Sequence, residues 1–424
     1  MNSQATFGLT VDIGTTWVTL HLVDLVSQKC VFQSVLKNPQ QSAGLDVVSR
    51  IRYSLGDDSR SRWLTSSIRR CVDEGTRRIL REHKISPTSI ADVVVVGNTV
   101  MHHFFFGFPV VCLLTPPYIA EHKEAMTVPC ASVGVKLGET TRCYSPPVIE
   151  SYVGPDAIAL MMASGLTQHE EPAIAIDIGT NTEIVLHSGD ATWVASAASG
   201  PAFEGMSLDC GMAAIEGAIR RVSIDPKSLR PTFEVLGHNS PLGICGTGVI
   251  SALAGMLDAG IVDSKGSMNR ELESVWLSKT GDVISYTVCP ATQSQTGKPI
   301  YISQLDLRLV QQSKAAIYAA VRVLMDYARL NADDVCRVYL TGSFGHRLNL
   351  EDVYRVGVLP RFGTAHIEQV LGAASIGADM IVVDPVRKRE AEQLAVSTRY
   401  VELIDNPLFQ TRYAEAQFFP PSGQ

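Results

Sequence analysis

The spacing of apolar residues near the start of the chain predicts β-structure. Between residues 8 and 37, alternating apolar segments are separated by a Gly-Thr turn and by a polar turn, which is typical of a three-stranded meander. Apolar residues then recur at helical spacing over 61–82, and the apolar run at 93–96 is typical of a strand buried on both faces. The chain is therefore predicted to open with a meander, a helix and a buried strand.

The same pattern starts again at residue 173. A strand ends at Asp177, a turn and a second strand follow, and a long helix at 306–330 leads to another buried strand at 338–340. The second copy differs from the first by an insertion at about 222–302. This repetition predicts an α/β protein with two equivalent lobes.

We place the first lobe at residues 1–168 and the second at 169–424. Two segments rich in small residues, 154–163 and 372–378, are predicted to be helices. Small residues at helical spacing allow two helices to approach closely, which suits a hinge between lobes.

The composition narrows the class of protein. The chain has 424 residues, of which 46% are hydrophobic, so it can bury sizeable cores. A formal net charge of -7 and a pI near 5.8 offer no attraction for nucleic acid or an anionic membrane. We find no signal-peptide pattern and no apolar run of membrane-spanning length, and we expect a cytoplasmic protein.

The nine cysteines are scattered along the chain without any C-x-x-C pair. This distribution shows neither the spacing of a zinc ribbon nor that of a ferredoxin-type cluster. We therefore expect buried, reduced thiols and no iron-sulfur cluster in this chain.

The turns that open the two repeats carry the candidate chemistry. Each combines an aspartate at a strand end with glycine and hydroxyl or amide residues, in the runs Asp12-Ile13-Gly14-Thr15-Thr16 and Asp177-Ile178-Gly179-Thr180-Asn181. A phosphate cradle needs backbone N–H groups in one concavity, with glycine where a side chain would obstruct it. A plain β-turn capped by its own aspartate is the alternative, and the duplication favours the phosphate loop.

Two carboxylates across a cleft could hold hydrated Mg²⁺ with the phosphates of ATP, and Asp12 and Asp177 are those carboxylates. Hydrolysis also needs an acceptor that positions the attacking water. Asp177 and Glu183 are our candidates for that task, whereas Asp12 is assigned mainly to the metal. Glu183 faces the same side as Asp177 only if the turn between them leaves the alternation of side chains along the strand intact.

Other candidates for the nucleotide site lie in the second repeat. Gly246 and Thr247 belong to a glycine-rich segment before a helix, which could bind an anion or could reflect tight packing. Gln311 and Lys314 share a helix face and could reach ribose or base, or could be solvated. The turn after the strand at 338–340 adds three candidates for binding adenosine, namely Gly342, Ser343 and Phe344.

The order of these features resembles the superfamily of acetate and sugar kinases, heat-shock protein 70 and actin. That resemblance implies two ribonuclease-H-like lobes with ATP in the cleft between them. More specifically, several stretches look like the ATPase domain of reductive activators of corrinoid proteins: Asn38-Pro39-Gln40, Asp46 to Ile51, Gly97 to His103, Ala198 to Gly205 and Gly243 to Gly248.

The resemblance to these activators implies a function. They use ATP to drive reduction of an inactive Co(II) corrinoid to Co(I), which restores methyl transfer in systems such as anaerobic O-demethylation. It also implies a corrinoid protein as partner, with Asn98 and Glu204 as candidates to face it. We expect a homodimer.

One departure from the family pattern concerns the electron source. The activators generally carry an iron-sulfur domain, and no cluster-binding spacing occurs here. We therefore expect either a truncated ATPase module or a separate iron-sulfur donor. The alternative functions are a sugar or carboxylate kinase of the same fold and a nucleotide-gated filament.

Overall fold

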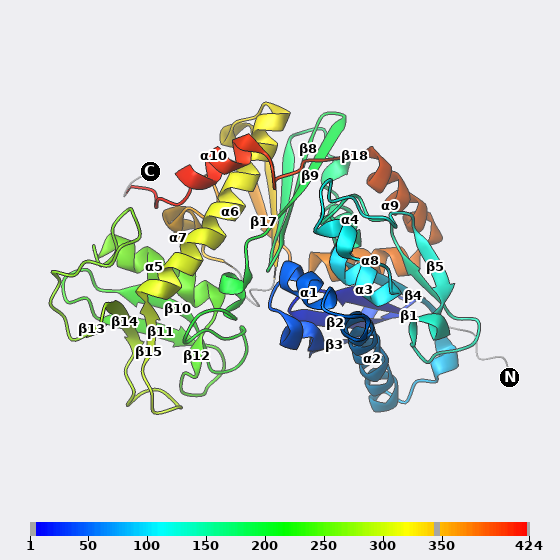
Figure 1. Ribbon diagram of the computed structural model, residues 1–424, viewed down its shortest axis with the longest axis horizontal. Coiled ribbons are helices and arrows are strands. Elements are labelled where there is room, and N and C mark those ends of the chain that lie inside the picture. Colours follow the sequence, from blue (N-terminus) through cyan, green and yellow to red (C-terminus); the bar gives the residue numbers. More distant parts are fainter. Residues whose placement is uncertain (1–5, 343–347, 422–424) are drawn as a thin grey trace. The chain divides into compact units, whose positions relative to one another are not determined.

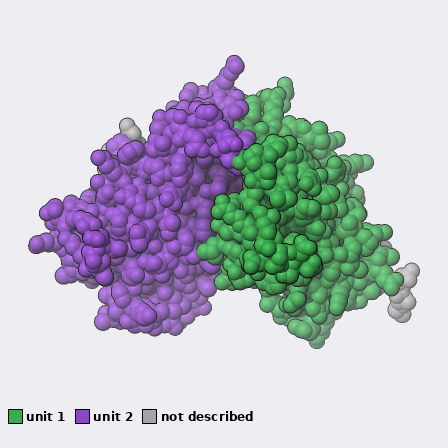
Figure 2. Space-filling view, viewed as in Figure 1, with its two compact units in different colours: residues 1–175, 185–195, 372–401 green, residues 176–184, 196–371, 402–424 purple. Residues whose placement is uncertain are grey.

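The computed structural model describes residues 6–342 and 348–421 (Figure 1). The chain forms two compact units (Figure 2). Unit 1 comprises residues 1–175, 185–195 and 372–401, and unit 2 comprises residues 176–184, 196–371 and 402–424. Among the described residues, none of the helices combines the length and apolar character that crossing a bilayer requires.

The main sheet of unit 1 has the strand order β3-β2-β1-β4-β6-β5. Strands β1 to β3 form the predicted antiparallel meander, and β4 and β6 continue the sheet in parallel with β1. Its strands are β1 (Phe7–Ile13), β2 (Trp17–Asp24), β3 (Lys29–Lys37), β4 (Ile90–Gly97), β5 (Met126–Pro129) and β6 (Arg142–Ser145).

The second six-stranded sheet has the order β17-β16-β7-β8-β9-β18. The meander β7-β8-β9 takes the place of β1-β2-β3, while β16 and its parallel neighbour β17 take the places of β4 and β6. Its strands are β7 (Ala173–Ile178), β8 (Thr182–Ser188), β9 (Ala191–Ala197), β16 (Arg337–Gly342), β17 (His366–Gln369) and β18 (Thr398–Tyr400). The predicted duplicated ribonuclease-H-like α/β fold is confirmed.

The insertion adds two small sheets, β11-β10-β12 and β13-β14-β15. Their strands are β10 (Ala218–Ile224), β11 (Pro231–Val235), β12 (Gly243–Ile244), β13 (Leu277–Thr280), β14 (Val283–Cys289) and β15 (Ile300–Ser303).

The helices of unit 1 include both segments that are rich in small residues. They are α1 (Val47–Ser54), α2 (Asp58–Glu82), α3 (Thr99–Phe106), α4 (Pro155–Ser164), α8 (Ala373–Val383) and α9 (Pro385–Ser397). Helices α4 and α8 pack directly against one another, since a β-carbon at Gly377 would lie 2.0 Å from the carbonyl oxygen of Ala159. The predicted close approach is confirmed; its use as a hinge stays a prediction.

Helix α8 lies far along the chain, yet it packs on β1, β2 and β4. This packing assigns residues 372–401 to unit 1, although the sequence placed them in the second lobe. The prediction divides the chain where the sequence pattern repeats, near residue 168. The two compact units are instead defined by contacts, which join segments that lie far apart in the sequence.

The helices of unit 2 are α5 (Gly246–Asp258), α6 (Gln304–Ala328), α7 (Leu350–Val356) and α10 (Pro407–Glu415). Helix α6 begins with a capping box, in which Ser303 and Asp306 satisfy each other's backbone N–H groups, and most of its residues are buried. It is therefore a central helix of this unit.

Candidate functional site

The first Asp-Gly-Thr loop, as we call residues 12–16, in which Ile13 separates the aspartate from the glycine, joins β1 to β2 in unit 1. Three donors hold its backbone carbonyls: Asn38 Nδ2 reaches Gly14 at 2.8 Å, Arg50 reaches Thr15 at 2.5 Å, and Gln41 Nε2 reaches Thr16 at 2.9 Å. These hydrogen bonds engage the carbonyls of three consecutive loop residues and hold the turn in place.

Arg50 braces this loop from helix α1. The side chain is fully buried, and its guanidinium also donates to the Gly44 carbonyl at 3.0 Å and to Gln40 Oε1 at 3.3 Å. Arginine suits this task because its planar fork presents several donors in fixed directions. Two of the stretches that carried the family resemblance thus have a structural purpose, which is to hold the first loop.

Asp12 lies in β1 directly before the loop. Its carboxylate accepts a hydrogen bond from Ser375 on α8 at 3.1 Å. Burial raises the pKa of Asp12 to about 6, and the Ser375 hydrogen bond and the charge of His21 offset only part of that effect. A carboxylate that costs this much to ionise suits a site that receives positive charge.

Asn98 adjoins the same loop. Its Oδ1 caps helix α3 by accepting from the Met101 N–H at 3.0 Å, and its Nδ2 donates to Thr15 Oγ1 at 3.2 Å. The side chain is only 5% exposed, so it contacts the loop and is not available at the surface in this structure. Its expected role as a partner-facing residue gains no support from this position.

The second Asp-Gly-Thr loop joins β7 to β8. Ser199 Oγ donates to the Gly179 carbonyl at 3.0 Å and lies 2.8 Å from Thr182 Oγ1, while the Gly200 N–H donates to the Thr180 carbonyl at 2.8 Å. Asn181 lies in the same turn. This loop is also braced by a stretch that carried the family resemblance.

Glu204 lies beside the second loop. It ends a short 3₁₀ turn, Pro201–Glu204, and its Oε1 accepts a hydrogen bond from Thr180 Oγ1 at 2.8 Å. The residue is 7% exposed, and a β-carbon at Gly179 would lie 3.5 Å from the same oxygen. The structure thus brings a buried carboxylate to the phosphate-loop candidate, and the expected role of Glu204 in facing a partner stays a prediction.

Asp177 and Glu183 occupy different parts of the second meander. Asp177 lies in β7 just before the loop and is half-buried. Glu183 lies within β8, where its Oε1 accepts a hydrogen bond from Ser196 on β9 at 3.1 Å. Glu183 therefore interacts with the neighbouring strand, whereas Glu204 contacts the loop.

Helix α5 begins close to the Glu204 turn. A β-carbon at Gly246 would lie 1.9 Å from the Phe203 carbonyl oxygen, so glycine is required there by packing alone. The first residues of the helix have no side-chain cap, and Thr247 Oγ1 lies 3.4 Å from Cys245 Sγ. Packing thus explains Gly246, while phosphate binding by Gly246 and Thr247 stays a prediction.

Gly342 ends β16. It has a φ of +139°, and a β-carbon would lie 2.1 Å from the Ile178 carbonyl oxygen, so the end of β16 closely approaches the end of β7. The other two candidates in this turn, Ser343 and Phe344, lie outside the described residues.

Gln311 and Lys314 are both buried on α6 and contact the C-terminal segment. Gln311 Nε2 donates to the Gln417 carbonyl at 2.9 Å, and Lys314 Nζ donates to the Phe418 carbonyl and lies 4.8 Å from the centre of the Phe419 ring. Burial lowers the pKa of Lys314 to about 7. The alternative of a solvated lysine is excluded, and the predicted contact with ribose or base stays a prediction.

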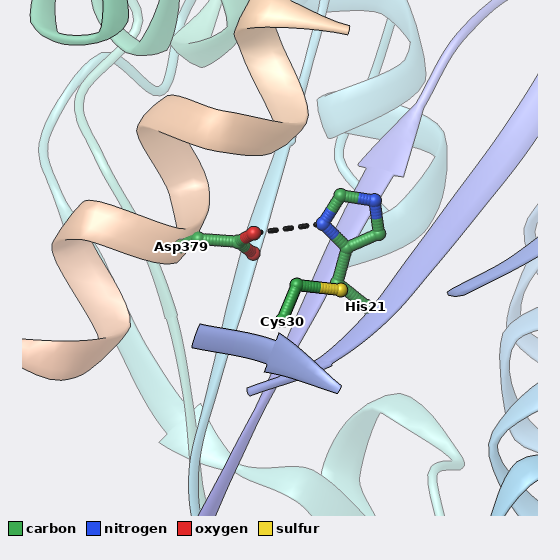
Figure 3. Close-up of side chains that lie close together, drawn as sticks. All are labelled: His21, Cys30 and Asp379. Carbon is green, nitrogen blue, oxygen red and sulfur yellow. Dashed lines mark hydrogen bonds and ion pairs between the residues drawn. The ribbon is translucent and has the colours of Figure 1, made fainter. Parts of the chain in front are cut away.

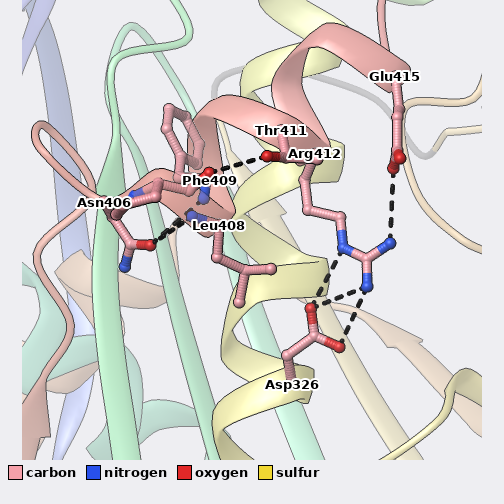
Figure 4. A network of polar contacts seen from close by, with 8 residues as sticks. Asp326, Asn406, Leu408, Phe409, Thr411, Arg412 and Glu415 are labelled. Carbon is pink, nitrogen blue, oxygen red and sulfur yellow. Dashed lines mark hydrogen bonds and ion pairs between the residues drawn. The ribbon is translucent and has the colours of Figure 1, made fainter.

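The C-terminal segment reaches this position because α10 is anchored on α6. Arg412 pairs with Asp326 at 3.1 Å and with Glu415 at 3.5 Å, and Asn406 caps α10 through the N–H groups of Leu408 and Phe409 (Figure 4). The sequence did not indicate this docking, because the contacts join residues about 86 positions apart.

A duplicated ribonuclease-H-like fold with a braced Asp-Gly-Thr loop in each repeat defines a protein of the ASKHA class. The model of the RACo middle region matches residues 7–169, and that of the C-terminal domain of RACo, the ASKHA domain, matches residues 171–424. The chain belongs to the RACo family.

Individual relatives agree with this assignment. The chain is 26% identical to the corrinoid activation enzyme RamQ of Eubacterium limosum, covering 96% of this chain and 69% of the relative. It is 23% identical to the [Co(II) methylated amine-specific corrinoid protein] reductase of Methanosarcina barkeri, covering 92% and 74%.

A solved structure is also similar. The reductive activator for corrinoid, iron-sulfur protein superposes with a TM-score of 0.92 at 32% identity, over 99% of this chain and 67% of that one.

Proposed function

We propose that this chain is the ATPase that reductively activates a corrinoid protein. ATP binding and hydrolysis would be coupled to transfer of one electron to an inactive Co(II) corrinoid, which yields Co(I) competent for methyl transfer. The observation that carries the ATPase assignment is the Thr180–Glu204 hydrogen bond, which places a carboxylate beside the second phosphate loop. The corrinoid partner is supported by the names of the two curated relatives.

The donor set fits Mg-ATP. Two braced loops provide glycine and threonine at the turns, and each follows an aspartate. Asp12 and Asp177 would hold Mg²⁺ through water, and the metal would neutralise charge on the phosphates. Gly14, Thr15 and Thr16 in one loop, and Gly179, Thr180 and Asn181 in the other, would donate to the phosphate oxygens.

Glu204 is our candidate for positioning the attacking water. A buried carboxylate that already accepts from a threonine hydroxyl has further acceptor capacity for a water proton. We prefer it to Glu183, because the hydroxyl that Glu204 contacts belongs to the second loop, whereas Glu183 contacts Ser196 on the neighbouring strand. Gly246, Thr247 and Gly342 remain candidates for the phosphate and adenosine ends of the nucleotide.

In this proposal, the binding energy of ATP couples hydrolysis to the reduction of the partner's corrinoid. ATP would favour one conformation of the protein and thereby change the coordination of the partner's corrinoid, and hydrolysis would release that partner. The electron would come from an iron-sulfur centre outside these residues, either in a separate protein or in a domain missing from this chain. We also propose a boundary between the two repeats near residue 168, a homodimer and a cytoplasmic location.

One anaerobic experiment tests this function. The chain, Mg-ATP, a reductant and a Co(II) corrinoid protein of a methylamine methyltransferase system are mixed, and the visible spectrum is followed. We expect Co(I) to accumulate only with ATP, and the corrinoid protein to stimulate ATP hydrolysis. Phosphorylation of a sugar or carboxylate, with no response to the corrinoid protein, would favour the kinase and overturn the proposal.

A further inference from the structure

Three side chains with different metal-binding atoms meet in unit 1. They are His21 on β2, Cys30 at the start of β3 and Asp379 on α8 (Figure 3). One ligand atom from each residue lies within 4.8 Å of the other two. None of the three belongs to the phosphate-loop site described above.

A β-bulge brings Cys30 to this position. In the antiparallel pairing of β2 with β3, His21 faces Gln33 and Leu22 faces Phe32, but Val23 faces Cys30 because the register shifts by one residue. Side chains alternate between the two faces of a sheet, so the shift turns Cys30 to the face that carries His21 and Val23. With regular pairing, Val31 would occupy this place.

Asp379 is oriented for the cluster by a neighbour. Thr10 Oγ1 on β1 donates to its Oδ1 at 2.6 Å, which turns Oδ2 toward His21 Nδ1 at 2.8 Å. Within residues 6–342 and 348–421, no lysine or arginine pairs with this carboxylate. A hydrogen bond that fixes a carboxylate from behind is typical of metal ligands.

The His21 ring presents Nδ1 to the cluster, and its other nitrogen, Nε2, is buried without a hydrogen-bond partner among the described residues. Cys30 is exposed, which leaves one side of the group open to water. Three protein ligands with an open fourth position resemble the arrangement that zinc takes at sites holding a water.

We infer that His21, Cys30 and Asp379 bind a zinc-type divalent ion, with water as the fourth ligand. Imidazole and thiolate favour such an ion over Mg²⁺ or Ca²⁺, which prefer sites made of oxygen alone. Ligand atoms around tetrahedral zinc lie roughly 3 to 4 Å apart, given bonds of about 2.0 to 2.3 Å. The observed group needs only small side-chain shifts to reach that spacing.

Without metal, a hydrogen bond joins His21 Nδ1 to Asp379 Oδ2. Binding replaces the imidazole proton of that hydrogen bond and the thiol proton of Cys30, so both protons pass to solvent and no redox change occurs. The ion would tie α8 to the meander, one helical turn from Ser375, which contacts Asp12. This inference does not depend on the proposed ATPase activity.

Cobalt provides the spectroscopic test. The full chain, stripped with a chelator, is titrated with Co²⁺ and then with Zn²⁺. We expect a thiolate-to-cobalt charge-transfer band with the visible bands of tetrahedral Co²⁺, and loss of these bands when Zn²⁺ is added. Zn²⁺ should also raise the midpoint of thermal unfolding, because it binds only the folded site.

Matched variants locate the ion. Cys30→Ser should abolish the charge-transfer band, whereas Cys336→Ser, at an exposed cysteine of unit 2, should leave it intact. Thr10→Val should weaken Co²⁺ binding about tenfold, since it removes the group that orients Asp379. Absence of the band in the parent chain, or its persistence in Cys30→Ser, would overturn the inference and leave an ordinary His–Asp pair.

Discussion

The two Asp-Gly-Thr loops share a backbone design but differ in the group that contacts their threonine. In the first loop, Thr15 Oγ1 accepts a hydrogen bond from the Asn98 amide. In the second, Thr180 Oγ1 donates to the Glu204 carboxylate. Asn98 and Glu204 are both buried, and each contacts the threonine of its loop.

For the proposed ATPase, this difference suggests different tasks for the two loops: one in binding the nucleotide and the other in activating water. A neutral amide beside a phosphate loop adds no charge, and it can support binding of an anion. A carboxylate beside the other loop repels phosphate but can accept a proton from water, which hydrolysis requires. If the loops bind ATP as proposed, this asymmetry would give the first loop mainly a role in binding and the second loop mainly a role in hydrolysis.

Replacing the aspartates one at a time gives the largest effect. Asp177→Asn should lower kcat for ATP hydrolysis by roughly 10³-fold or more, because it removes a carboxylate that is a candidate both for Mg²⁺ and for positioning the attacking water. Asp12→Asn should act mainly on the KM for Mg-ATP, since we assign Asp12 mainly to the metal and not to the attacking water. Steady-state kinetics over a range of Mg-ATP concentrations measures both values.

Circular dichroism and thermal unfolding of both variants provide the control for folding. Equal losses of kcat in the two variants would show that the loops are chemically equivalent. The comparison would then fail, even if both variants bound ATP less tightly.

Glu204→Gln makes the second loop resemble the first. The amide can still contact Thr180 but cannot accept a proton, so kcat should fall about 100-fold with little change in the KM for Mg-ATP. Glu183→Gln is the matched control, because Glu183 is also a buried glutamate but contacts Ser196 in the sheet. If Glu183→Gln is the more severe change, Glu183 is the better candidate for positioning water, as the sequence predicts, and Glu204 is structural.

Sequence patterns predicted much of the fold because they are local. The alternating strands, the helix of residues 306–330 and the repeated loops each follow from spacing within about 25 residues or from their recurrence. The pairing of the strands into two equivalent sheets then follows from the duplication. The phosphate-loop candidates were found in the same way, because glycine and threonine stand next to an aspartate.

The side chains around these loops could not be placed from spacing. Glu204 reaches Thr180 from a turn 24 positions away, and Arg50 reaches Thr15 from 35 positions away. Helix α8 joins unit 1 through contacts that span more than 350 residues, such as Ser375 with Asp12. The only signal for Glu204 and Arg50 was that both lie in stretches resembling the activator family.

The groups that brace the loops should differ in their effect on stability. Arg50→Met removes the guanidinium donors and leaves the buried Thr15 carbonyl and the half-buried Gly44 carbonyl without them, so the free energy of unfolding should fall by roughly 3 kcal/mol. Ser199→Ala removes one hydroxyl from the second loop and should cost about 1 kcal/mol. Equilibrium unfolding in urea compares the two, and the reverse order would show that the second loop depends more on its brace.

The buried Lys314 adds a contribution to stability that depends on pH. Burial lowers the pKa of Lys314 from 10.5 to about 7. Between about pH 7 and pH 10.5, Lys314 holds a proton in the unfolded chain but not in the folded chain, so the free energy of unfolding rises with pH. The free energy of unfolding should increase by roughly 2 kcal/mol between pH 7 and pH 9 relative to Lys314→Met. Urea titrations of both proteins at a series of pH values measure this difference, and parallel pH curves would show that Lys314 stays charged when folded.

The converse exchange, Asn98→Asp, should have the smallest effect. Aspartate caps a helix as well as asparagine, so α3 should keep its cap. Thr15 can reverse its hydroxyl and donate to the new carboxylate, as Thr180 does to Glu204. The added negative charge should raise the KM for Mg-ATP a few-fold and leave kcat unchanged. An increase in kcat would mean that a carboxylate at either loop can activate water, and the division of tasks between the loops would then have to be abandoned.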